Sequence, residues 1–108
     1  MQQYPVRPSH RKNLDPVALA AIARTHFDSV ETNGDTVTAR WGAIERLIAR
    51  AEQRELSVEL TMNPKVPEDV AAQTIARYNR FLEEATGFGA KERARRLRKS
   101  VRAGPDED

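Results

Sequence analysis

The chain contains no cysteine among its 108 residues, so it can form neither a disulfide framework nor a thiolate metal site. No apolar run approaches the roughly 18 residues that a membrane-spanning helix needs, and the first residues lack the apolar stretch of a signal peptide. We therefore expect a cytoplasmic protein with no membrane role. Aromatic residues are few, and we expect Trp41 and Tyr78 to serve the core rather than a ligand.

Residues that carry catalytic chemistry are also sparse. Neither His10 nor His26 has a histidine or carboxylate at a metal-binding spacing such as that of H-E-x-x-H. His26 fits a helix C-terminus, where a histidine interacts favourably with the dipole. Two pairs of adjacent carboxylates fit helix ends and exposed faces better than a cleft: Glu68/Asp69 and Glu83/Glu84. We predict that the protein is not an enzyme and binds no metal and no cofactor.

Charge is distributed unevenly, although the net charge is only +2. Residues 1–12 carry three basic residues and no acid, and residues 89–102 carry seven basic residues against one acid, a net charge of +6. Residues 13–88 are mildly acidic, with eight basic and twelve acidic residues. We predict a basic N-terminal arm over 1–12, a single domain over 13–102 and a disordered acidic tail over 103–108.

Helix and strand signals alternate along the first part of the domain. Asp15 followed by Pro16 predicts the start of a helix over 16–26. Asn33-Gly34 is the strongest short hairpin signal, and a two-residue loop there would join strands at 28–32 and 35–41 with Val30 opposite Val37. Strict alternation predicts another half-buried strand at 56–62.

Residues 43–52 fit two structures. As a helix, the segment places four apolar residues on one face: Ile44, Leu47, Ile48 and Ala51. As a strand, it turns at Gln53-Arg54 and pairs with the strand at 56–62, with Ile48 facing outward. Local propensity favours the helix, and both alternatives stay open on the residues alone.

Two helices complete the chain. The first opens at Pro67 and ends at Gly87, which can take the left-handed position beyond the helix. The second runs from about Ala90 to Arg102 and has a narrow apolar stripe: Ala90, Ala94, Leu97 and Val101. The periodicities predict a core that includes Trp41, Val58, Leu60, Ile75, Tyr78, Phe81 and Leu82. The fold class is therefore α+β, an antiparallel sheet of three or four strands flanked by an N-terminal helix and two C-terminal helices.

A C-terminal motif resembles that of a known family. The stretch Ala76-Arg77-Tyr78-Asn79-Arg80-Phe81-Leu82-Glu83-Glu84-Ala85-Thr86-Gly87-Phe88 precedes Ala90-Lys91-Glu92-Arg93 and Arg96-Leu97. This Tyr-Asn-x-Phe-Leu-Glu-x-Ala-Thr-Gly-aromatic pattern, with its basic Ala-Lys-Glu-Arg continuation, is similar to a family of small archaeal proteins of unknown function. The resemblance implies that 45–52 is a strand in an antiparallel sheet, and it implies no activity.

The basic C-terminal helix is the one feature that indicates a function. Five of its cations fall on one side by helical spacing: Lys91, Arg95, Arg98, Lys99 and Arg102. Arg93 and Arg96 lie on the flanks, where they could pair with acids of the body. With Arg11 and Lys12 of the arm, the five form a candidate nucleic-acid interface, RNA rather than DNA because no recognition-helix pattern is present.

Three interpretations of this basic helix remain. It could bind RNA or a ribonucleoprotein through the phosphates of the RNA backbone. The charge run could equally be a solvated face with no partner. Alternatively, the apolar stripe of the helix or the second face of the sheet docks on an acidic protein surface or on a second copy of the chain, which makes the protein an interaction module or a homodimer.

Overall fold

The computed structural model describes residues 2–52 and 54–102, with side chains from 2–52 and 54–96. The predicted acidic tail, 103–108, lies outside the described residues. The elements follow one another along the chain as β1 (Gln2–Pro5), the 3-10 helix η1 (Pro8–Asn13), α1 (Pro16–His26), β2 (Asp28–Asn33), β3 (Thr36–Trp41), β4 (Ile44–Glu52), β5 (Glu55–Met62), α2 (Glu68–Thr86) and α3 (Ala90–Arg102).

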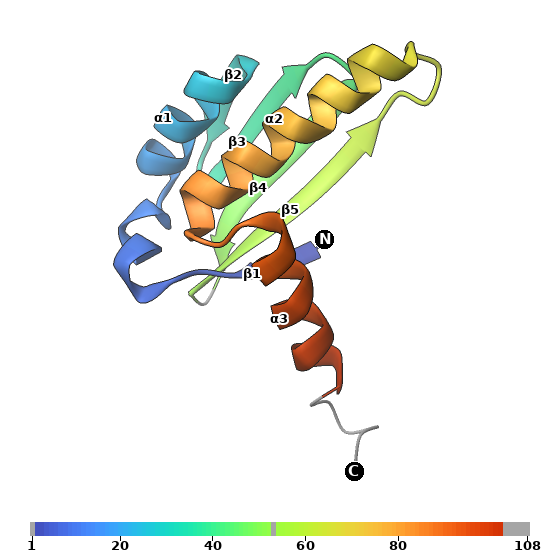
Figure 1. Ribbon diagram of the computed structural model, residues 1–108. Helices are drawn as coiled ribbons and strands as arrows, with labels where there is room; N and C mark the ends of the chain where they lie inside the picture. Colours follow the sequence, from blue (N-terminus) through green and yellow to red (C-terminus); the bar gives the residue numbers. More distant parts are fainter. Residues whose placement is uncertain (1, 53, 103–108) are drawn as a thin grey trace.

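One antiparallel sheet with the strand order β1-β5-β4-β3-β2 forms the framework. α1 and α2 pack on the same face of it, and α3 extends away from the body beside β1 (Figure 1). This arrangement confirms the α+β class. The expected count of three or four strands is corrected to five, because Gln2–Pro5 of the predicted arm pairs with β5 as an edge strand.

β4 is a strand, so the helix favoured by local propensity over 43–52 is wrong and the strand implied by the resemblance is confirmed. Leu47 pairs with Leu60 and Ala49 with Val58, and β3 pairs along the other side of β4. Leu47 and Ala49 are fully buried on the face that α1 and α2 cover. Pairing on both sides and burial of one face outweigh the propensity of single residues.

The β2–β3 hairpin has a different register from the predicted one. Its two-residue loop is Gly34-Asp35, so Asn33 pairs with Thr36 and Thr32 with Val37. Gly34 has φ +64°, which suits glycine at the first central position of a type II′ turn. Val30 is therefore not opposite Val37, and the register shifts again between Asp28 and Glu31.

The core follows most of the predicted periodicity. Val58, Phe81 and Leu82 are buried, and three more predicted residues are half-buried at its margin: Trp41, Leu60 and Tyr78. Ile75 is a wrong prediction, because its exposed fraction is 52%.

The cause of the Ile75 error is the residue before it. Thr74 faces the sheet, where its Oγ1 accepts a hydrogen bond from the Ala43 amide at 3.0 Å and donates one to the Val70 carbonyl at 2.7 Å. A buried hydroxyl that is satisfied in this way costs little. Its inward position turns the side chain of Ile75 about 100° away from the core.

Candidate nucleic-acid interface

The N-terminal segment caps the C-terminal end of α2. The Asn13 Nδ2 donates to the Glu84 carbonyl at 3.2 Å and to the next carbonyl at 3.4 Å. The Arg7 amide donates to the Thr86 carbonyl at 2.9 Å, and the Arg7 Nε donates to the Gly87 carbonyl at 2.7 Å. The last carbonyls of a helix have no partner within the helix. Here residues some 70 to 80 positions earlier supply the partners, which fixes the basic N-terminal segment at this end of α2.

Gly87 makes this close approach possible. It ends α2 with φ +82°, the left-handed conformation predicted from the sequence. A Cβ atom at this position would lie 2.7 Å from the His10 Nδ1 and 2.8 Å from the Arg7 Cδ. Both the backbone conformation and the space therefore require glycine.

Arg93 anchors the start of α3 on the body. Its exposed fraction is 4%, and its guanidinium donates to the Phe88 carbonyl at 2.6 Å and to the Asn79 Oδ1 at 2.8 Å. Burial lowers the pKa of Arg93, and the neighbouring Tyr4 and Tyr78 oppose that shift. The expectation that Arg93 pairs with an acid of the body is corrected. Its hydrogen-bond partners are the Phe88 carbonyl and the side-chain amide oxygen of Asn79, which lie beside the start of α3.

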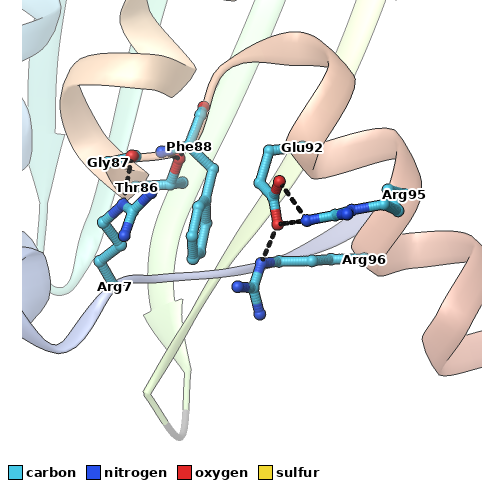
Figure 2. A network of polar contacts seen from close by, with 7 residues as sticks. All are labelled: Arg7, Thr86, Gly87, Phe88, Glu92, Arg95 and Arg96. Atoms are coloured by element: carbon cyan, nitrogen blue, oxygen red, sulfur yellow. Dashed lines mark hydrogen bonds and ion pairs between the residues drawn. The ribbon is translucent and has the colours of Figure 1, made fainter.

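Phe88 lies between two arginines from opposite ends of the chain. The Arg7 guanidinium carbon is 4.6 Å from the centre of the Phe88 ring, and that of Arg96 is 4.3 Å from it. Figure 2 shows the ring between the two side chains. Phe88 itself is 4% exposed, so these cation–π contacts cover it. The stack joins the N-terminal segment to α3.

Glu92 partly neutralises the first turns of α3. Its carboxylate accepts hydrogen bonds from Arg95 at 2.7 and 2.9 Å and from the Arg96 Nε at 2.8 Å (Figure 2). The hydrogen bond from Arg95 is the main cause that lowers the pKa of Glu92. Arg96 thus does pair with an acid, but with one on its own helix rather than one on the body.

Comparison with known proteins shows which family this chain is part of. A family model described as "Domain of unknown function (DUF5611)" matches residues 1–99. The chain belongs to the DUF5611 family. It is similar to the hypothetical protein TA0095 from Thermoplasma acidophilum, whose solution structure was determined by NMR, with 26% sequence identity and a TM-score of 0.67. The match covers 90% of this chain and 97% of that one. No curated protein matches the chain.

This membership confirms the predicted family of uncharacterised archaeal proteins. That the Tyr-Asn-x-Phe-Leu pattern is a motif of this family stays a prediction. Within the ranges 2–52 and 54–102 of this DUF5611 chain, no helix is long and apolar enough to cross a membrane. The same ranges hold no group of three or more side chains able to ligate a metal ion.

The seven predicted interface residues of the DUF5611 chain fall in two elements. Arg11 and Lys12 are exposed on η1, and Lys91 and Arg95 are exposed on α3. The other three, Arg98, Lys99 and Arg102, lie in α3 beyond the described side chains. η1 and the start of α3 flank the same end of α2. The two basic stretches meet through Arg7 and Arg96, which both contact Phe88, and no hydrogen bond or ion pair between described side chains joins Arg11 or Lys12 to Lys91 or Arg95.

Sequence reasoning missed Arg7 as part of this end of the DUF5611 fold, whereas it does predict that Phe88 folds back beyond Gly87. An aromatic residue directly after the left-handed Gly87 indicates a side chain folded back onto the helix, and Phe88 is indeed buried. No local pattern links Arg7 to it, because the contact joins positions about 80 residues apart.

Proposed function

We propose that the protein is a non-enzymatic, cytoplasmic accessory module that binds RNA or a ribonucleoprotein through α3 and the basic N-terminal segment. The observation that supports this most is the meeting of the two basic stretches, 1–12 and 89–102, at the C-terminal end of α2, where Arg7 and Arg96 flank Phe88. Two positively charged segments held beside each other offer an RNA backbone more phosphate contacts than either segment alone.

Binding at this interface would be electrostatic and largely independent of base sequence. Phe88 is covered by its two arginines, and within the described residues α3 carries no aromatic side chain on which a base could stack. The spacing of Arg95, Arg98 and Lys99 places them on one side of α3. These residues would follow one strand of phosphates.

Glu92 would compete with RNA for the same arginines. Its carboxylate holds Arg95 and Arg96 at hydrogen-bond distance, and a bound phosphate would take its place. We therefore expect Glu92→Gln to tighten binding and to steepen the dependence of log affinity on log salt by about 0.7 to 1.4, the equivalent of one or two phosphate contacts. A matched control is Glu68→Gln, which removes an exposed carboxylate from the opposite end of α2 and should leave binding unchanged.

The test of the interface itself is filter binding to a generic single-stranded RNA at several salt concentrations. Replacing Arg95, Arg98 and Lys99 together with Gln should weaken binding and flatten the slope by about two units, since each contact contributes about 0.7. Stability should barely change, because exposed charges contribute little to it.

A second triple variant controls for net charge. Arg24, Lys65 and Arg80 are exposed cations on other parts of the body, and their replacement with Gln should change the slope far less than the α3 variant does. Absence of binding by the native protein at low salt, or equal effects of the two triple variants, would refute the RNA proposal.

An interaction module or a homodimer is the second candidate. The two residues of the apolar α3 stripe with described side chains, Ala90 and Ala94, are exposed, so the body does not cover the start of the stripe. Light scattering on the pure protein tests the homodimer directly. A mass near 24 kDa, twice that of the 12.2 kDa chain, that persists in high salt would favour this candidate, and a monomer would leave only a partner of different sequence.

A further inference from the structure

A hollow of about 290 Å³ opens on the sheet face opposite α1 and α2. Six residues of β2, β3 and β4 line it: Ser29, Glu31, Thr38, Ala39, Arg40 and Arg46. Alternation along β3 points Thr38 and Arg40 away from the buried Val37 and Ala39, so the hollow lies on the solvent side of the sheet. It is near the β2 edge, whereas α3 packs beside β1 at the other edge.

Three register shifts of the sheet border the hollow. The β2–β3 register shifts between Asp28 and Glu31, and Ser29 within that shift has φ +53°. On the other side, the β4–β5 register shifts between Ile44 and Arg46. Bulges bend a strand and re-aim its side chains, and a left-handed serine is uncommon enough to indicate a local requirement. Arg40 itself lies within the third shift, between Ala39 and Trp41 of the β3–β4 pair.

The two arginines of the hollow are weakly engaged by the protein. Among the described residues, no carboxylate lies within 4.0 Å of the Arg40 guanidinium, and Arg46 reaches Glu59 only at 3.4 Å. Arg50 on the same face of β4 differs, because it holds Glu52 at 2.7 Å. Two guanidinium groups on neighbouring strands, one without a described carboxylate within 4.0 Å and the other with a single contact at 3.4 Å, suit a bidentate anion.

The remaining polar groups of the hollow restrict the chemical class of ligand that it can bind. The hydroxyls of Ser29 and Thr38 belong to residues that line the hollow, and a hydroxyl can donate to an anion. The carboxylate of Glu31 on the same wall repels a bare anion but accepts from a hydroxyl or an amine. The volume is at the low end for small-molecule sites.

We propose that this hollow binds a small phosphate monoester that carries a hydroxyl or amino group next to its phosphate. Arg40 and Arg46 hold the phosphate, the two hydroxyls complete its contacts, and Glu31 accepts from the neighbouring donor group. The site is separate from the RNA interface proposed above and does not depend on it.

Titration of the ¹⁵N-labelled protein with glycerol 3-phosphate tests the proposal. Saturable amide shifts should centre on Ser29, Glu31, Thr38 and Arg40. Arg40→Gln and Arg46→Gln should each weaken binding about tenfold or more, as expected for the loss of a charge-assisted bidentate contact. Glu59→Gln should tighten binding, because it removes the carboxylate that competes for Arg46.

Three comparisons make the result decisive. Arg50→Gln removes a cation from the same strand and face and should change the affinity less than twofold; an effect equal to that of Arg40→Gln would overturn the proposal. Glycerol should not bind, and the phosphodiester ApA should bind at least about fivefold more weakly, because it lacks a terminal phosphate. Absence of saturable shifts at millimolar glycerol 3-phosphate, or equal binding of ApA, would also overturn it. Arg40→Gln should leave the salt slope of RNA binding unchanged, so the two proposals fail separately.

Discussion

Arg93 makes the sharpest prediction about stability. In Arg93→Met the apolar stem is retained and the guanidinium is lost, which leaves the Phe88 carbonyl and the Asn79 Oδ1 without the donors now at 2.6 and 2.8 Å. The hydrogen bond to the Phe88 carbonyl is buried and the one to the Asn79 Oδ1 is part-buried, and a buried acceptor that loses its partner costs about 1 to 3 kcal/mol. Removal of the buried charge recovers part of that cost. The expected net loss in the free energy of unfolding is about 2 kcal/mol, a fall in Tm of about 8 to 16 °C for a domain of this size.

Urea denaturation at pH 7 followed by circular dichroism measures this loss. Arg95→Met on the same helix is the matched control, because Arg95 is exposed and its ion-pair partner among the described residues is Glu92; its free energy of unfolding should barely change, since an exposed ion pair contributes little. In a double-mutant cycle with Asn79→Ala, the two losses should be clearly non-additive, since the residues share one hydrogen bond. A loss for Arg93→Met as small as that of Arg95→Met would refute the anchoring role.

Two other variants test the packing of the core and the ionisation of Tyr78. Phe81→Ala should cost about 3 to 5 kcal/mol in urea denaturation, because Phe81 is fully buried and packs on the Phe27 ring at 5.3 Å; a loss under about 1 kcal/mol would contradict the packing described. Burial raises the pKa of Tyr78 above its usual 10.0, so above pH 10 the unfolded chain releases a proton that the folded chain keeps, and stability falls as pH rises. Between pH 9 and 11 the free energy of unfolding of Tyr78→Phe should fall less steeply with pH than that of the native protein. The two slopes should differ by up to about 1.4 kcal/mol per pH unit, and parallel profiles would show that ionisation of Tyr78 does not affect stability.

Local signals were sufficient where a residue interacts with its own neighbourhood. Asp15 accepts from the amides of Val17 and Ala18 at 2.8 and 3.1 Å, as a helix start predicts. Gly87 adopts the left-handed conformation predicted for it. The hairpin turn was found, but its register was displaced, because Gly34 takes the first rather than the second position of the two-residue loop. The bulge at Asp28–Glu31 shifts the register again and has no signal in the sequence.

Long-range contacts decided the elements that the sequence left open or misplaced. β4 became a strand because β3 and β5 pair on both sides of it, and its residues taken alone favour a helix. Ile75 was assigned to the core by helical periodicity, but its side chain is exposed. The inward position belongs to Thr74, whose hydroxyl bonds the Ala43 amide across the layer, a contact that periodicity cannot reveal.

The basic helix was identified from composition, but the roles of its cations were not. Arg93 is a buried anchor, and Arg96 lies over Phe88 and pairs with Glu92. Of the α3 cations with described side chains, Lys91 and Arg95 are the two that are exposed and belong to the predicted interface, and Arg95 pairs with Glu92 as well. The net charge of +6 over residues 89–102 therefore overstates what the first turns of α3 offer a ligand. Since Glu92 holds Arg95 and Arg96, the RNA binding proposed for α3 would require displacement of this carboxylate, and its strength would depend on how readily Glu92 is displaced.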